Sequence, residues 1–205
     1  MGAISVSSAE FRFGSDLVDK LPRVQTIEIA FIGRSNAGKS TLINKITGKS
    51  GLAHASSTPG KTRAINIFEV KLSLPKHKSK GLFLADLPGY GFAKISKRER
   101  EKLNLLTLDY ISSRVGLVAV ALLCDCRRKP DRDDLAARDI ISERGAYPLI
   151  VATKSDTLNQ KDKHAALTGM AKGFNLEVGD LFVAPGEALR CRDEFWERAV
   201  PLFGE

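Results

Sequence analysis

The feature that most limits how this chain can fold is an eight-residue loop at positions 33–40. Its letters, Gly33-Arg34-Ser35-Asn36-Ala37-Gly38-Lys39-Ser40, fit the pattern G-x-x-x-x-G-K-S/T. An apolar, β-branched run at 27–32 precedes the loop, and helical apolar spacing follows at 39–46. Such a strand–loop–helix unit turns backbone N–H groups and the positive end of the helix toward phosphate oxygens. The pattern predicts a phosphate-binding loop in which Lys39 reaches the β- and γ-phosphates and Ser40 binds Mg²⁺.

The rest of the chain alternates strand-like and helix-like patterns. Apolar runs predict strands at 65–72, 81–85, 117–123, 147–152 and 181–184. Amphipathic spacing predicts helices at 96–114, 131–145, 161–173 and 191–203. This alternation favours one domain with a mainly parallel sheet covered by helices on both faces. We interpret residues 1–22 as an N-terminal lead-in, in which Phe11 and Phe13 can dock on the domain at 23–205.

Composition sets the broad class of protein. The 205 residues are 43% hydrophobic and 27% charged, as in an ordinary soluble globular protein. No apolar run approaches the roughly 18–20 residues of a membrane span, and no secretory signal is visible, so we expect a cytoplasmic protein without a membrane partner. The three cysteines form no disulfide framework and are expected to be free thiols in a reducing compartment: Cys124, Cys126 and Cys191.

A second motif, Asp86-Leu87-Pro88-Gly89, follows the predicted strand at 81–85. A carboxylate at a strand end can hold Mg²⁺ through water, and the Gly89 amide can meet a γ-phosphate. On its own, D-x-P-G is more often an ordinary turn. Because it follows the phosphate loop with one predicted strand between them, we interpret it as a γ-phosphate sensor.

A third motif, Thr153-Lys154-Ser155-Asp156, closes the predicted strand at 147–152. Guanine presents N1–H and N2–H₂ donors, and a carboxylate such as Asp156 accepts both, whereas adenine cannot match this pattern. The stem of Lys154 can lie over the base plane. On its own, a Lys–Asp turn at a strand end is the commoner reading. Together the three motifs predict a GTPase, and Asp156 argues against the alternative of an ATP-using phosphotransferase.

With these motifs the chain resembles the Ras-like GTPases of the TRAFAC class and, more closely, the EngB (YihA/YsxC) family of ribosome-biogenesis GTPases. The match covers about residues 8–203 and rests on the phosphate loop, Ser57-Thr58-Pro59-Gly60-Lys61-Thr62, Asp86-Leu87-Pro88-Gly89-Tyr90-Gly91-Phe92-Ala93-Lys94, Asp125-x-Arg127 and Thr153-Lys154-Ser155-Asp156. The resemblance implies an α/β, three-layer P-loop GTPase fold. Its six-stranded, mostly parallel sheet would have one antiparallel edge strand, at 65–72.

The resemblance also completes the expected site. Thr62 would be the switch I threonine that ligates Mg²⁺ together with Ser40, while Asp86 acts through water. Catalysis would depend on Lys39, Thr62, Gly89 and Asn36. The expected nucleotide contacts are Gly33, Arg34, Ser35, Asn36, Ala37, Gly38, Lys39, Ser40, Thr41, Gly60, Lys61, Thr62, Arg63, Ala64, Asp86, Leu87, Pro88, Gly89, Thr153, Lys154, Ser155, Asp156, Val183, Ala184 and Pro185.

Asn36 matches the residue that coordinates a potassium ion in some related GTPases. A bound K⁺ could place positive charge near the β–γ bridge, as an arginine finger does. The alternative is that Asn36 only caps or stiffens the loop.

The chain departs from the expected pattern in three places. Tyr90 stands where Ras-type enzymes have a Gln, and an aromatic ring cannot position water through an amide, so we expect slow intrinsic hydrolysis. Val183-Ala184-Pro185 replaces the Ser-Ser loop of the family. The Ala184 N–H could still donate to guanine O6, but Pro185 has no N–H. Thr153 replaces the Asn of most GTPases and offers one hydroxyl in place of an amide.

The net charge of +8 comes from 32 basic and 24 acidic residues. Basic residues gather at 76–80, 94–102 and 127–129, and the second group lies just beyond the γ-phosphate sensor. We expect a monomer, and the resemblance implies that it binds the large ribosomal subunit, so GTP could order a basic segment that docks on rRNA. The family is also linked to cell division and septation. The alternatives are a solvated helix face, or a GTP-gated adaptor for a division or signalling protein that never touches RNA.

Overall fold

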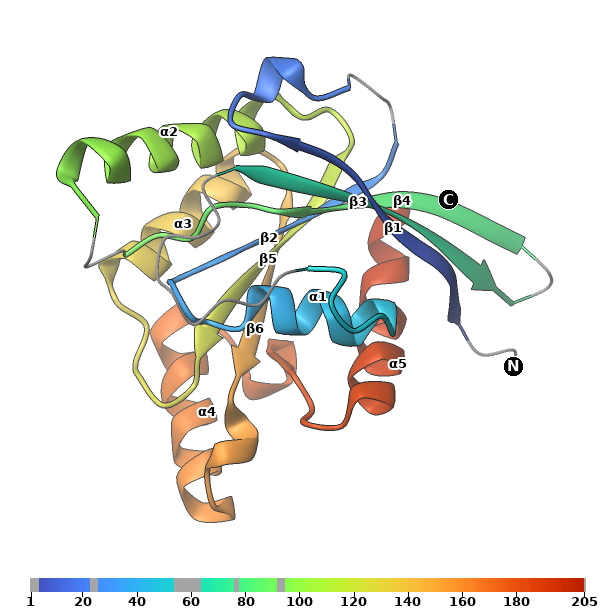
Figure 1. Ribbon diagram of the computed structural model, residues 1–205. Coiled ribbons are helices and arrows are strands. Elements are labelled where there is room, and N and C mark those ends of the chain that lie inside the picture. Colours follow the sequence, from blue (N-terminus) through green and yellow to red (C-terminus); the bar gives the residue numbers. More distant parts are fainter. Residues whose placement is uncertain (1–3, 23–25, 54–63, 76–77, 92–94, 205) are drawn as a thin grey trace.

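The computed structural model describes residues 4–22, 26–53, 64–75, 78–91 and 95–204. One seven-stranded sheet forms its centre, with the strand order β1-β3-β4-β2-β5-β6-β7 (Figure 1). Strands β2, β4, β5, β6 and β7 are parallel, while β3 is antiparallel to both β4 and β1. The strands are β1 (Ser5–Ser15), β2 (Glu28–Gly33), β3 (Ile65–Leu74), β4 (Lys78–Asp86), β5 (Leu117–Asp125), β6 (Tyr147–Thr153) and β7 (Phe182–Val183).

Helices cover both faces of this sheet. The α-helices are α1 (Lys39–Thr47), α2 (Lys97–Ser113), α3 (Arg132–Glu143), α4 (Gln160–Phe174) and α5 (Ala188–Ala199). Short 3-10 turns lie at Val18–Lys20, Ser155–Thr157, Val178–Asp180 and Val200–Phe203. Apolar side chains of α1 and α5 share one buried cluster, and those of α2, α3 and α4 share the other. The predicted doubly covered α/β fold is therefore confirmed.

The central strand β2 shows why the sheet takes two helix layers. All six of its residues are buried. Ile29 and Phe31 belong to the cluster with α1 and α5, while Ala30 and Ile32 belong to the cluster with α2, α3 and α4. A continuous apolar run is what a strand buried on both faces requires. The strand ends at Gly33, on the side of the sheet formed by the carboxyl ends of the parallel strands. Ligands of open α/β sheets bind on that side.

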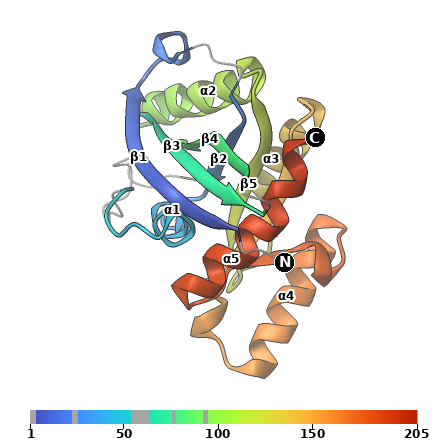
Figure 2. The same cartoon turned by 90° about the vertical axis from the view of Figure 1, so that its right-hand side faces the viewer.

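The N-terminal segment differs from the prediction. Residues 5–15 form strand β1, which pairs along its whole length with β3, so the sheet has seven strands and β3 is not its edge (Figure 2). The sequence hides this strand because Ala9 is its only buried residue and two register shifts interrupt the period-two pattern. Phe11 packs edge-on against Phe68, with ring centroids 6.0 Å apart, yet stays 54% exposed.

A buried charge joins β2 to the end of α2. Glu28 is fully buried and accepts hydrogen bonds from the Tyr110 hydroxyl (2.7 Å) and from Nε of Arg114 (3.0 Å). Arg114 also donates to the Pro22 carbonyl at 2.8 Å. These contacts fix the carboxyl end of α2, the helix that begins just beyond the second motif.

We expect Arg114→Met to lower the free energy of unfolding by about 3–5 kcal/mol, because it leaves the Glu28 carboxylate buried without a counter-charge. Urea unfolding followed by circular dichroism measures the change. Arg144→Met, at an exposed position after α3, is the matched control and should change stability by less than about 0.5 kcal/mol. If both variants lowered the free energy of unfolding by the same small amount, the Glu28–Arg114 ion pair would not have this stabilising role.

Candidate nucleotide-binding site

The predicted phosphate loop connects β2 to α1, and its backbone conformation depends on two residue types. A side chain at Gly33 would place its Cβ 2.6 Å from the Leu123 carbonyl oxygen, so only glycine fits beside β5. Gly38 (φ +99°) precedes α1 in the left-handed region. Asn36 is exposed and also left-handed (φ +64°), a conformation that Asn tolerates better than most residues. These residues therefore determine the course of the predicted phosphate loop between β2 and α1.

Asp86 ends β4 directly beside the start of α1. Its carboxylate is only 3% exposed, and its Oδ1 has no hydrogen-bond partner among the described residues. Burial raises the pKa of Asp86, while the Lys39 charge and a hydrogen bond from Ser40 act in the opposite direction. Burial likewise lowers the pKa of Lys39, against the attraction of Asp86. The structure thus brings together the three side chains that the sequence assigns to phosphate and Mg²⁺.

Backbone hydrogen bonds join the phosphate loop to the segment after Gly89. The Tyr90 N–H donates to the Gly33 carbonyl, and the Ser35 N–H donates to the Tyr90 carbonyl, both at 3.2 Å. Gly91 (φ +69°) lies against the Arg34 guanidinium, where a Cβ would come within 2.9 Å of Nε. The phosphate loop and the γ-phosphate sensor therefore form one connected unit.

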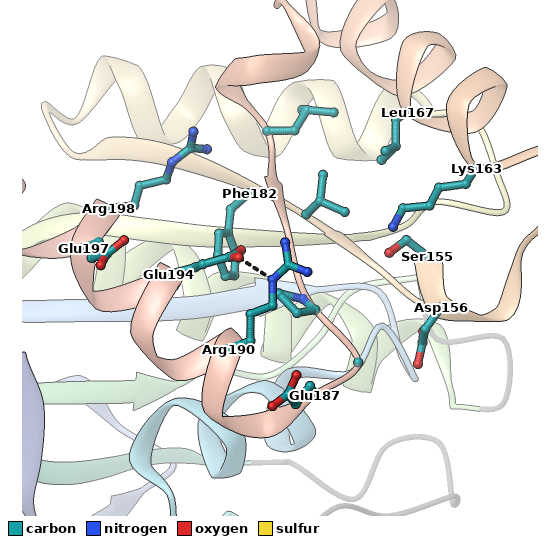
Figure 3. Close-up of a pocket in the computed structure, with 14 residues that line it drawn as sticks. Ser155, Asp156, Lys163, Leu167, Phe182, Glu187, Arg190, Glu194, Glu197 and Arg198 are labelled. Atoms are coloured by element: carbon teal, nitrogen blue, oxygen red, sulfur yellow. Dashed lines mark hydrogen bonds and ion pairs between the residues drawn. The ribbon is translucent and has the colours of Figure 1, made fainter. Parts of the chain in front are cut away.

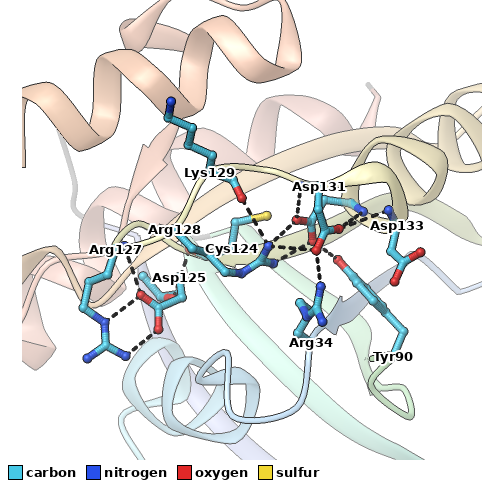
Figure 4. A network of polar contacts seen from close by, with 11 residues as sticks. Arg34, Tyr90, Cys124, Asp125, Arg127, Arg128, Lys129, Asp131 and Asp133 are labelled. Atoms are coloured by element: carbon cyan, nitrogen blue, oxygen red, sulfur yellow. Dashed lines mark hydrogen bonds and ion pairs between the residues drawn. The ribbon is translucent and has the colours of Figure 1, made fainter. Parts of the chain in front are cut away.

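Side chains extend this unit to α3 (Figure 4). Arg34 forms an ion pair with Asp131, the N-cap residue of α3. The Tyr90 hydroxyl donates a hydrogen bond of 2.7 Å to Oδ1 of Asp134. The Asp134 carboxylate is fully buried, and each of its two oxygens also accepts a hydrogen bond from Arg128, at 2.7 and 2.8 Å. Burial raises the pKa of Tyr90 well above its usual range, so the phenol stays protonated. The ring of Tyr90 is held toward α3.

The base-reading segment is fastened to the phosphate loop by Thr153. Its buried hydroxyl lies 2.8 Å from the Ala37 carbonyl and 3.2 Å from the Cys124 carbonyl. Lys154 has a left-handed backbone (φ +60°), and its Nζ lies 2.9 Å from Oδ2 of Asp125. Burial alone would raise the pKa of Asp125, but hydrogen bonds from Arg127 and Lys154 hold it well below its usual range. The Thr153 hydroxyl thus joins the two halves of the predicted site, which are the phosphate loop and the base-reading segment.

Asp156 follows in the 3-10 turn after β6. Its carboxylate is exposed and makes no hydrogen bond or ion pair with another described residue, which leaves it available to a ligand. The neighbouring loop after β7 differs from the expectation. The Ala184 N–H, expected to be available to guanine O6, donates instead to the Ala152 carbonyl at 2.9 Å and extends the β6–β7 pairing.

Four predicted nucleotide contacts fall outside the described residues: Gly60, Lys61, Thr62 and Arg63. The motif residues Phe92, Ala93 and Lys94 and Lys76 of the first basic group also lie outside them. Ala64, directly before β3, is described. Other residues of the site carried no sequence signal. Asp131 and Asp134 belong to α3 and its N-cap and reach the loop only through the fold, because 97 residues separate Asp131 from Arg34.

Thr153→Val tests the link between the two halves of the site. We expect it to weaken GDP binding about five- to tenfold, because the Ala37 carbonyl loses a buried hydroxyl donor worth about 1 kcal/mol. Titration calorimetry measures the affinity. Thr168→Val, on the exposed side of α4, makes the same chemical change away from the site and should leave the affinity unaltered. Equal affinities of the two variants would argue against this role.

Comparison with known proteins gives consistent matches. The family model described as "50S ribosome-binding GTPase" matches residues 28–154. The "Probable GTP-binding protein EngB" of Anaeromyxobacter dehalogenans (strain 2CP-C) is 36% identical over 203 residues, covering 98% of this chain and 94% of that protein. The protein of the same name in Clostridium perfringens (strain SM101 / Type A) is 39% identical over 180 residues, covering 85% of this chain and 87% of that protein.

Solved structures share the fold. The crystal structure of a probable GTP-binding protein engB has a TM-score of 0.62 at 22% identity, covering 86% of this chain and 98% of that one. A point variant of Aquifex aeolicus Era bound to GDP·AlF4⁻ has a TM-score of 0.60 at 17% identity, and the match covers 88% of this chain and 58% of that one. At these identities the two structures support the fold alone.

Proposed function

The chain belongs to the EngB family of GTP-binding proteins, and from this premise we propose that it is a GTP-dependent assembly factor for the large ribosomal subunit. It is a GTPase, as its family is. The observation that carries the proposal is the direct attachment of the phosphate loop to Tyr90, a few residues before the basic helix α2. A change at the γ-phosphate would therefore reach an exposed cationic surface.

The phosphates are bound by groups that the loop already presents. The ammonium of Lys39 and the loop N–H groups are proposed to face the β- and γ-phosphates, apart from the N–H groups of Ser35 and Ala37, which already donate to backbone carbonyls. The Gly89 N–H would meet the γ-phosphate. The unpartnered Oδ1 of Asp86, beside Ser40, fits a hydrated Mg²⁺. Thr62 would complete the metal site. When bound, Mg²⁺ neutralises charge on the phosphate oxygens.

Guanine is proposed to pair with Asp156 and to lie along the stem of Lys154, which the ion pair with Asp125 holds in place. Asp156→Asn should weaken GTP binding by about 10²- to 10⁴-fold, since two hydrogen bonds to a charged group contribute about 1.5–3 kcal/mol each. The variant should prefer XTP, whose O2 accepts from the new amide. Asp109→Asn, exposed on α2, is the control. Unchanged preference for GTP in Asp156→Asn would exclude this base site.

Hydrolysis by the protein alone is proposed to be slow. The Tyr90 side chain is tied to Asp134 by a 2.7 Å hydrogen bond and has no amide with which to orient an attacking water. Phosphate release by purified protein should therefore be far below tens per second, and a rate of that size would overturn the proposal. A partner that supplies the missing group would accelerate the reaction.

Potassium is proposed to supply part of the missing charge. Asn36 is exposed on the loop in a left-handed conformation, so its side chain is accessible to an ion beside the phosphates. We expect faster hydrolysis in K⁺ than in Na⁺ buffer with ribosomal subunits present, and Asn36→Ala should abolish the difference. Equal rates in the two buffers would leave Asn36 only its conformational role in the loop.

The cationic surface on α2 is the proposed site for rRNA. Lys97, Arg98, Arg100 and Lys102 are exposed there. Lys97 and Lys102 have distant acidic neighbours, Glu101 at 4.0 Å and Asp16 at 3.7 Å. Within the described part of the chain, Arg98 and Arg100 form no ion pair. Unpaired arginines of this kind are suited to phosphate contacts.

Co-sedimentation with purified large subunits tests this surface. Binding in the GTP state should fall steeply with salt, and Arg98→Ala/Arg100→Ala should reduce the slope of log affinity against log salt by about 2, one for each lost phosphate contact. Lys161→Ala/Lys172→Ala, exposed on α4, removes the same charge elsewhere and is the control. Small subunits should not bind. A flat salt dependence would count against RNA contact.

We further propose that the protein acts in the cytoplasm as a monomer and that effects on division and septation are secondary to subunit assembly. None of the described helices is both long and apolar enough to cross a membrane.

A further inference from the structure

The loop after β7 contains backbone amides that the sheet does not use, and the first of them belongs to Gly186. The Ala184 N–H pairs with Ala152 of β6, and Pro185 has no N–H. The next N–H along the chain is that of Gly186, which donates no hydrogen bond to another described residue. Gly186 is exposed, so this amide is accessible to a ligand.

Gly186 lies directly against the base-reading carboxylate. A Cβ added at Gly186 would stand 3.3 Å from both Cβ and Oδ2 of Asp156, which is tighter than an ordinary contact. The amide of residue 186 and the Asp156 carboxylate are therefore neighbours. Guanine carries O6, N1–H and N2–H₂ side by side on one edge. A carboxylate that accepts from N1–H and N2–H₂ therefore needs a hydrogen-bond donor beside it to meet O6.

Lys45 on α1 holds this loop. Its ammonium donates to the carbonyl of Pro185 at 3.0 Å and to that of Gly186 at 2.8 Å. The Pro185 carbonyl and the Gly186 N–H belong to the same trans peptide, so a carbonyl directed at Lys45 turns the N–H away from it. A charge-assisted hydrogen bond to the carbonyl also polarises the N–H of that peptide.

One side of the loop faces an open cavity. Asp156, Pro185 and Gly186 line a cavity of about 740 Å³ that continues between α4 and α5, where Lys163, Arg190 and Glu194 project (Figure 3). Side-chain packing therefore leaves that side of the loop open. The backbone of α1 beside Lys45 is anchored, because the Ile46 carbonyl accepts a hydrogen bond from the buried Trp196 indole at 2.8 Å.

We propose that the Gly186 N–H is the donor to guanine O6 and that Lys45 is a positioning residue that orients this amide from the phosphate-loop helix. The assignment rests on the guanine-binding role proposed for Asp156. It replaces the Ala184 donor expected from the sequence, and it links recognition of the base to α1, which begins at the phosphate loop.

Substitution at Lys45 tests the positioning role. Lys45→Met should weaken GDP binding about tenfold, and Lys45→Arg, which keeps a cationic donor, should restore most of the affinity. Lys49→Met removes the same group from an exposed position just after α1 and should change the affinity less than twofold. Urea unfolding verifies that each variant is folded.

A base analogue separates this role from general support of the fold. In 6-thio-GDP a weakly accepting sulfur replaces O6, so the wild type should bind GDP more tightly than the analogue. Lys45→Met should largely remove that preference. If Lys45→Met weakens both nucleotides equally, or neither, Lys45 does not position the O6 donor.

The amide can be observed directly in ¹⁵N-glycine-labelled full-length protein, where Gly186→Ala identifies the resonance. Saturation with GDP should move the Gly186 amide proton downfield, and 6-thio-GDP should move it less. A Gly186 resonance that stays unmoved at saturation overturns the assignment. If Asp156→Asn changes base preference while Gly186 stays unmoved, this inference fails alone; if Asp156→Asn has no effect, the proposed base site fails with it.

Discussion

The Leu123 carbonyl approaches Gly33 so closely that no side chain can stand there, and this contact sets where the phosphate loop leaves the sheet. Because β2 is buried on both faces, it cannot move to admit a larger residue. The loop then starts at a fixed point between β4 and β5. Asp86 at the end of β4 and Thr153 at the end of β6 reach it only from there.

The loop is held from elements that are distant in sequence. Thr153 joins it to the base-reading segment, Tyr90 joins it to the γ-phosphate sensor, and the Arg34–Asp131 ion pair joins it to α3. The buried Asp134 is satisfied by Arg128 and Tyr90, and removal of either partner would leave a buried charge short of a donor. These contacts connect the predicted base, phosphate and switch regions through one loop.

The sequence was sufficient for the parts that local patterns encode. Buried apolar runs and amphipathic spacing identified the parallel strands and α-helices, and the motif at 33–40 located the phosphate loop. Strand β1 was missed because its register shifts interrupt the alternation and its stability comes from backbone pairing with β3. The contacts of Arg34, Tyr90 and Lys45 were missed because each joins residues far apart in the chain. The Ala184 amide could not be excluded as a donor until its pairing with Ala152 was visible.

The central claim is that the γ-phosphate controls a cationic surface through the segment around Tyr90. The most direct measurement is the affinity for purified large ribosomal subunits at fixed salt, compared between a non-hydrolysable GTP analogue and GDP. Our account predicts binding at least about tenfold tighter with the GTP analogue, a coupling of ordinary size for two linked sites. Equal affinity in the two nucleotide states would contradict it.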